Sequence, residues 1–150
     1  MSKKIIKNEL PENYEELKKA ANRTSSWRAR FDAVEELGKY HTSQVIDILN
    51  SRVANDPVYK VQEEAYRILL EFGEDVEVPE RKKFEVIKGA NKVFLRVKKS
   101  LPADHTFEQF LDKLKRMRND VYDAYEGEKG LDWLKNEWAN INTKSNNKLS

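Results

Sequence analysis

Apolar residues recur along most of this chain at the three- and four-residue spacing of amphipathic helices, with polar residues between them. The helices that this spacing predicts cover, in chain order, about residues 11–21, 27–37, 43–53, 57–72, 79–100, 106–125 and 131–141. Glycine and proline are scarce, with 5 and 4 residues, so a sheet built on tight turns is not favoured. We therefore expect an all-α protein of about seven helices.

Short polar residues mark several of the predicted helix boundaries. Asp56 and Pro57 suit the start of the fourth helix, because a carboxylate can accept a free N–H there and proline has no N–H to satisfy. Thr106 and Gln109 form the pattern of a capping box at the start of the sixth helix. Residues 143–150 have no apolar periodicity, and we expect them to be a disordered tail.

Two of the helices carry the same pattern thirty-two residues apart. The matched pairs are Trp27 and Tyr59, Ala29 and Val61, Ala33 and Ala65, and Leu37 and Leu69. A fixed period of this size is typical of helical repeats, in which each unit buries its apolar face against the next. Val93, Val97 and Leu101 continue the pattern once more, so residues 79–141 are expected to be either a degenerate third repeat or a terminal cap.

The residues that carry the repeat resemble a known family. Trp27–Gly38, followed by the Asp56–Pro57 start of the next unit, resembles HEAT-like repeats of the short bacterial kind. The resemblance covers about residues 24–72 and is closer in the first copy. Arg30 matches the arginine of such repeats, whereas the second copy has Gln62 at the equivalent position.

The resemblance implies an α-solenoid of antiparallel helix pairs, which we expect to form a single domain over residues 1–142. Leu70 stands where the first copy has Gly38, so the second copy departs from the pattern at its end as well. Solenoids of this kind offer an extended surface to a larger partner and seldom carry out chemistry themselves. A non-catalytic protein-interaction module or small adaptor is therefore the expected function.

Composition narrows the classes of protein that remain. The chain has 150 residues and no cysteine, so it has neither disulfide bonds nor thiolate metal sites. Its first residues carry charge but no apolar run of signal-peptide length. No stretch approaches the roughly 20 apolar residues that span a bilayer. We expect a cytoplasmic protein without membrane contact.

Charge is unevenly distributed along the chain. Residues 1–80 hold 12 Lys and Arg against 16 Asp and Glu, a net charge of −4. Residues 81–118 hold 12 against 4, a net charge of +8, and residues 119–150 hold 4 against 6, a net charge of −2. The middle of the chain is therefore a basic block between acidic ends.

Four cations of the basic block fall on one face of the predicted fifth helix. Lys88, Lys92, Arg96 and Lys99 follow one another at intervals of four, four and three residues. Such a row could bind another protein or follow the phosphates of a nucleic acid. The polar face of the block has no interleaved aromatic residues to stack bases, and the net charge of the chain is only +2. Protein binding is therefore the primary hypothesis, and nucleic-acid binding through residues 81–118 is the alternative.

Residues with catalytic or metal-binding potential are few. Asp120, Asp123 and Glu126 are three residues apart on a predicted helix, so they either converge on a hard cation or solvate the end of the helix. They do not match the spacing of a calcium-binding EF-hand loop. His41 and His105 each precede a threonine at a predicted helix start, where a loop role is favoured. The chain has no phosphate loop, nucleophile elbow or zinc motif, and we expect neither catalysis nor a cofactor.

One aromatic residue completes the expected binding surface. Trp133 lies off the apolar stripe of the last helix, so it either anchors a partner or packs on a neighbouring helix. The residues that we expect to contact a partner are Arg28, Arg30, Lys88, Lys92, Arg96, Lys99 and Trp133. Self-association is a third option, because a short solenoid leaves helices uncovered at its ends.

Overall fold

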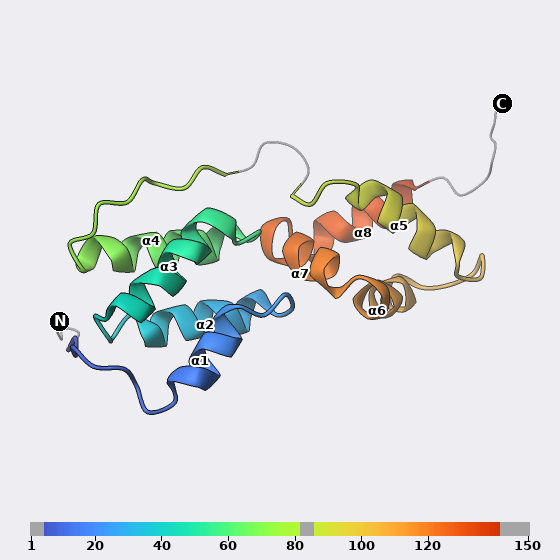
Figure 1. Ribbon diagram of the computed structural model, residues 1–150. Coiled ribbons are helices and arrows are strands. Elements are labelled where there is room, and N and C mark those ends of the chain that lie inside the picture. The colour runs from blue at the N-terminus through green and yellow to red at the C-terminus, as the bar shows by residue number, and fades with distance from the viewer. Residues whose placement is uncertain (1–4, 82–85, 142–150) are drawn as a thin grey trace. The chain divides into compact units, whose positions relative to one another are not determined.

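The structure, a computed structural model, describes residues 5–81 and 86–141. Within these ranges it contains eight α-helices and no β-strand (Figure 1). The helices are α1 Tyr14–Ala21, α2 Trp27–Leu37, α3 Ser43–Asn55, α4 Tyr59–Glu71, α5 Ala90–Lys99, α6 Phe107–Met117, α7 Asn119–Glu128 and α8 Leu131–Asn140. The all-α prediction is therefore confirmed, with eight helices in the described ranges in place of seven.

The chain divides into two compact units, Met1–Arg81 and Lys82–Ser150. Each unit has its own cluster of buried apolar side chains. The range over which we expect a single domain, residues 1–142, spans parts of both units, which meet in the sequence at Arg81. The tail predicted over residues 143–150 lies outside the described residues.

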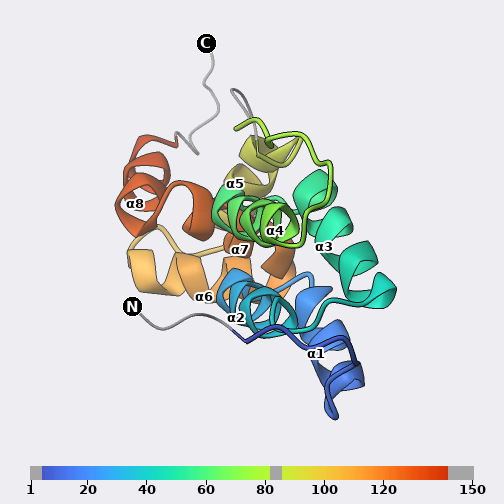
Figure 2. The same ribbon diagram turned by 90° about the vertical axis from the view of Figure 1, so that its left-hand side faces the viewer.

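The first unit contains the two helices that carry the thirty-two-residue repeat. These helices, α2 and α4, begin at the matched residues Trp27 and Tyr59 and pack against each other. α1 packs on α2, and α3 packs on α4 (Figures 1 and 2). The two helices that carry the matched residues are therefore neighbours.

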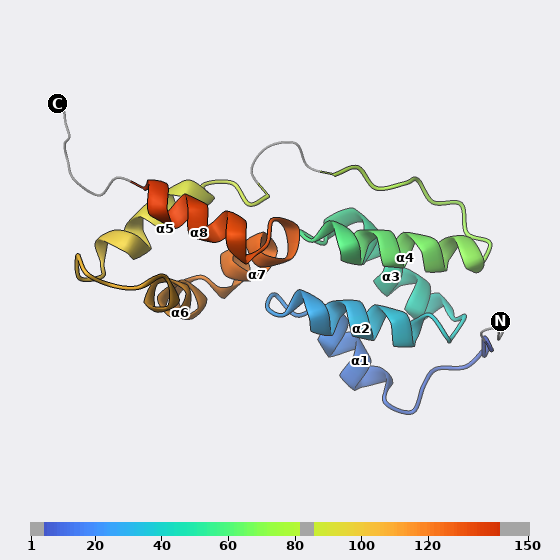
Figure 3. The same cartoon turned by 180° about the vertical axis from the view of Figure 1, so that it is seen from behind.

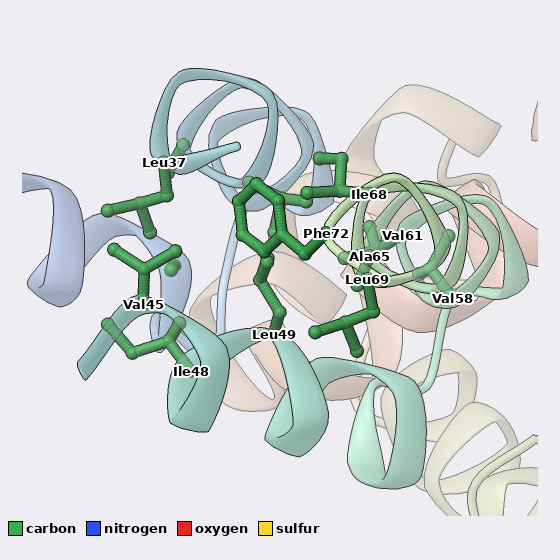
Figure 4. Close-up of a cluster of buried hydrophobic side chains, with 13 residues drawn as sticks. Leu37, Val45, Ile48, Leu49, Val58, Val61, Ala65, Ile68, Leu69 and Phe72 are labelled. Atoms are coloured by element: carbon green, nitrogen blue, oxygen red, sulfur yellow. The ribbon is translucent and has the colours of Figure 1, made fainter. Parts of the chain in front are cut away.

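Small and aliphatic side chains fill the space between these helices. Ala33 and Ala65, the matched small residues, are 3% and 0% exposed. Leu37, Leu49 and Ile68 come from three different helices and point into the common core (Figure 4). Each fully buried aliphatic side chain of this size stabilises the fold by about 1.5–3 kcal/mol relative to an exposed one.

Side-chain caps define two helix starts in this unit. The hydroxyl of Ser26 accepts the backbone N–H of Ala29 at 3.2 Å, and that of Thr42 accepts the N–H of Val45 at the same distance. The fourth helix, α4, begins at Tyr59, three residues after the start that we expected at Asp56.

The predicted helix from Pro79 to Ser100 is wrong. Residues 74–81 are extended, and α5 begins only at Ala90. Gly89, immediately before α5, has a φ of +81°, in the left-handed region that glycine adopts without steric cost. The apolar spacing of α5 continues on the N-terminal side of Gly89, but the left-handed conformation of that residue ends the helix there.

The extended residues 74–81, which we call the connector, run back along α4 (Figures 1 and 3). Val76 packs against the core of the first unit, and Pro79 is buried. The hydroxyl of Tyr59 donates to the carbonyl of Pro79 at 3.2 Å, and the guanidinium of Arg81 lies 4.8 Å from the centre of the Tyr59 ring. The connector is thus fixed to the start of α4 as well as to its end.

The second unit packs α5 and α7 on α6, with α8 against α6 and α7. Its buried centre includes Phe94, Phe110 and Tyr125, with rings 5.4–6.4 Å from that of Phe94. The single helix expected over residues 106–125 is two helices, because Arg118 leaves the helical conformation with φ −146° and ψ 74°.

The capping box predicted at the start of α6 is confirmed. Thr106 Oγ1 accepts the N–H of Gln109 at 3.2 Å, and Gln109 Oε1 accepts the N–H of Thr106 at 2.9 Å. Among the described residues no helix has the length and apolar character needed to cross a bilayer.

Candidate partner-binding surface

Arg28 lies on the exposed side of α2, as the sequence predicted. Its guanidinium carbon is 4.5 Å from the centre of the neighbouring Trp27 ring, and Lys60 Nζ of α4 is 4.9 Å from the same ring. The half-buried indole of Trp27 therefore lies close to two cations, and the negative charge on the faces of an indole ring attracts cations. This cluster joins the exposed sides of α2 and α4.

Arg30 does not lie on a surface, which corrects its assignment as a partner-binding residue. It is 1% exposed, and its Nε and Nη2 donate to Asp56 at 2.8 and 3.2 Å. Its Nη1 donates to the carbonyl of Arg23 at 3.1 Å. Asp56 also accepts from Arg52 at 3.1 Å and from the N–H of Val58 at 2.9 Å. This buried ion pair ties α2 to the link between α3 and α4.

Three of the four predicted cations of the basic block share the exposed face of α5. Lys92, Arg96 and Lys99 are exposed, and none of them takes part in an ion pair within the described ranges. Lys88 is exposed but precedes the helix, so the row of four is shortened to three. Cations in the last turn of α5 also complement the negative end of the helix dipole.

Lys98, on the same helix, has a different environment. Its ammonium group donates to the carbonyls of Trp138 and Ile141 at the end of α8 and lies 5.4 Å from the Trp138 ring. Burial disfavours the charged form of this group and lowers the pKa of Lys98. Lys98 therefore fastens α8 to α5 and is not part of the exposed row.

Trp133 packs within the second unit, which is the alternative to a partner anchor that the sequence left open. Its ring stacks on that of Tyr125 at 5.4 Å with an interplanar angle of 16°, and it meets Phe94 at 6.4 Å. The residue is half-buried and belongs to the partly buried margin of that core. This packing role corrects the assignment of Trp133 as an anchor for a partner.

Asp120 and Asp123, two members of the acidic row predicted on α7, lie in different environments. Arg118 donates to Asp120 at 3.0 and 3.1 Å, and this hydrogen-bonded guanidinium lowers the pKa of the Asp120 carboxyl. Asp123 is buried at 4% exposure. In the part of the chain that the structure describes, no three histidine or acidic side chains are placed to hold a metal ion.

The two histidines lie in different units. His41 stacks on Phe72 of the first unit at 4.5 Å. His105 Nε2 accepts the indole N–H of Trp138 at 2.8 Å, and its Nδ1 is 2.6 Å from the carbonyl oxygen of Pro102. Each ring has a packing role, as expected for loop histidines.

The surface that sequence reasoning missed is an apolar groove of about 580 Å³ on the first unit, which we call the α2–α4 groove. Its lining residues are Phe31, Lys60, Glu63, Glu64, Tyr66, Arg67, Leu70 and Val78. Leu70 and Val78 are 48% and 61% exposed, large values for aliphatic side chains. The only signal in the sequence was the replacement of Gly38 of the first copy by Leu70 in the second.

Carboxylates lie in this lining and next to it. Glu63 and Glu64 belong to the lining, and Asp32 and Glu35 line an adjoining hollow that shares Glu64 and Arg67 with it. Asp32, Glu35 and Glu63 are exposed. In the connector, three further exposed carboxylates flank Val78 in sequence, namely Asp75, Glu77 and Glu80. Arg67 is already paired with Glu64 at 2.7 Å and with Glu71 at 2.9 Å. The margin of the groove on the α2 side is therefore acidic.

Comparison with protein-family models, with curated proteins and with solved structures found no match for this chain.

Proposed function

We propose that this chain is a non-catalytic protein-interaction module built on HEAT-like helix pairs, and that its partner docks in the α2–α4 groove. The observation that carries the proposal is the exposure of Leu70 and Val78 beside Phe31 in one apolar hollow. Contiguous exposed apolar surface of this kind marks interaction sites on proteins. Aromatic and arginine side chains, which are enriched in interfaces, lie next to it as Trp27 and Arg28.

The packing of equivalent helices supports the repeat architecture in this proposal. α2 and α4 lie next to each other and start thirty-two residues apart, so both contribute to one exposed face. In helical repeat proteins such a face is the usual binding surface. Two helix pairs provide only a short face, which suits a single peptide segment or helix of a partner.

Photocrosslinking in cells tests the proposal. A photoreactive amino acid is placed at Leu70 in the groove or, as a control, at Leu131 of α8, which is 46% exposed and thus matches the 48% exposure of Leu70. We expect illumination to link a defined partner protein to the chain when the probe is at Leu70 and not when it is at Leu131. Equal patterns of products from the two sites would contradict the proposal.

A second function is favoured by one specific observation, the exposed row of Lys92, Arg96 and Lys99, which forms no ion pair with the residues that the structure describes. Such a row on a unit in which 15 Lys and Arg oppose 10 Asp and Glu, a net charge of +5, could bind nucleic-acid phosphates. Binding of a labelled DNA duplex that weakens steeply with salt, and that is lost when the three cations are replaced by alanine, would establish it. Absence of binding at low salt would exclude it.

A further inference from the structure

We infer that the segment docking in the α2–α4 groove is a basic amphipathic helix, with an apolar stripe flanked by lysine and arginine. The inference rests on the proposed function and adds the chemistry of the partner. It follows from two features of the groove, its apolar lining and the exposed carboxylates in and next to that lining.

Among the residues that the structure describes, no cation forms an ion pair with the exposed carboxylates of the acidic margin. Within the described ranges Asp32, Glu35 and Glu63 take part in no ion pair. The same holds for the exposed carboxylates of the connector, Asp75, Glu77 and Glu80. Such charges raise the rate of association with a cationic partner and suppress binding of an anionic one.

The cations near the groove already contact other side chains of the first unit. Arg67 is shared between Glu64 and Glu71, and Lys39 pairs with Glu36 at 2.9 Å. Lys60 lies over the Trp27 ring, at the end of the groove where α4 begins. The first unit as a whole has 13 Lys and Arg against 16 Asp and Glu, a net charge of −3.

The apolar lining is bordered by carboxylates of α2 and α4. Phe31 and Asp32 of α2 line an adjoining hollow together, and Glu63 of α4 belongs to the lining of the groove, with Leu70. A helix with one apolar stripe and cations beside it can contact the apolar lining and these carboxylates together, because residues at i, i+3, i+4 and i+7 share its buried face.

Two other occupants fit less well. A nucleic acid would bring phosphates against exposed carboxylates such as Asp32 and Glu63. In a dimer with its two-fold axis at the groove, the same patch of both copies would meet. The acidic margins of the two copies would then repel each other. Both remain measurable outcomes.

The test uses the whole chain and a fluorescein-labelled synthetic helix of leucine and lysine, about four turns long. Fluorescence anisotropy gives its affinity, and a peptide in which glutamate replaces lysine is the charge control. We expect the lysine peptide to bind at least about tenfold more tightly than the glutamate peptide, and the difference to shrink as salt rises past the point where exposed charges are screened. Equal affinities would overturn the inference.

Matched variants place the binding on the groove. Asp32→Asn combined with Glu63→Gln removes two charges from the margin, and Asp47→Asn combined with Glu12→Gln removes two exposed charges elsewhere on the first unit. We expect the first pair to weaken the lysine peptide by about three- to tenfold and the second pair by less than about twofold. Equal losses would show attraction to the net charge alone and would overturn the inference.

The remaining outcomes separate this inference from the proposed function. If a partner is crosslinked at Leu70 while the lysine peptide does not distinguish the two variant pairs, the groove is a docking site and the basic helix is refuted. If light scattering shows a mass that rises with concentration and falls back to one chain in Leu70→Ser, the occupant is a second copy. Competition by a DNA duplex for the peptide site would likewise overturn the inference.

Discussion

At the scale of single residues, Arg30 shows how a side chain can fit a surface pattern and yet be buried. It is polar and lies between Arg28 and Asp32, both of which are exposed. Its burial depends on Asp56, twenty-six residues away, which supplies the opposite charge. No periodicity on α2 encodes that partner. Trp133 lies off the apolar stripe of its helix and is nevertheless half-buried. Its contact with Tyr125 depends on how α8 packs on α7, which no local pattern encodes.

The buried pair of Arg30 and Asp56 gives a stability prediction. Arg30→Met leaves the Asp56 carboxylate buried with only Arg52 as an ionic partner, and we expect unfolding of the first unit to become easier by about 3 kcal/mol. Arg67→Met, which breaks the surface ion pairs with Glu64 and Glu71, should cost less than about 1 kcal/mol. Hydrogen exchange of α2 and α4 peptides in increasing urea measures both. Similar costs for the two variants would argue against the role given to Arg30.

Asp120 gives a prediction for pH dependence. Because the hydrogen bond from Arg118 lowers the folded pKa below the ordinary value of 3.8, its contribution to stability is present above that value and is lost as the pH falls through the folded pKa. We expect Asp120→Asn to cost less than about 1 kcal/mol at neutral pH, since the pair is partly exposed, and nothing once the carboxyl is protonated. Urea unfolding across pH measures this. A cost that persists in strong acid would contradict it.

At the scale of elements, the sequence predicted what depends on neighbours in the chain and missed what depends on backbone conformation. The capping box of Thr106 and Gln109 is a local pattern and was predicted correctly. The break at Arg118 and the left-handed Gly89 were not predicted, because apolar spacing continues through both positions. The path of the connector depends on the hydrogen bond between Tyr59 and the carbonyl of Pro79, twenty residues apart, which the sequence does not reveal.

The capping box gives a prediction for a single helix. Thr106→Ala removes the acceptor for the N–H of Gln109, and we expect the second unit to lose about 1 kcal/mol of stability. Thr106→Ser keeps the hydroxyl and should lose much less. Hydrogen exchange at the first turn of α6 should accelerate in the alanine variant and not in the serine variant. Equal protection in both variants would show that the cap is not needed.

At the scale of the whole molecule, the two clear copies of the repeat both lie in the first unit. Most of their matched residues, namely Ala33, Leu37, Val61, Ala65 and Leu69, are buried in the core. The repeat therefore predicted which faces of α2 and α4 pack and gave no information on their exposed faces. The groove formed by Phe31, Leu70 and Val78 needs residues from both helices and from the connector. It could be found only once their packing was known.

The proposed role of the α2–α4 groove is tested most directly by how much partner the chain retains when the groove is altered. Tagged chains carrying Leu70→Ser or Leu131→Ser change two leucines of similar exposure, 48% and 46%, in different units. Recovery of the protein that crosslinks at Leu70 is then compared with the unaltered chain. We predict that Leu70→Ser lowers recovery at least about tenfold and that Leu131→Ser leaves it within about twofold. Equal recovery by the two variants would contradict docking in the groove.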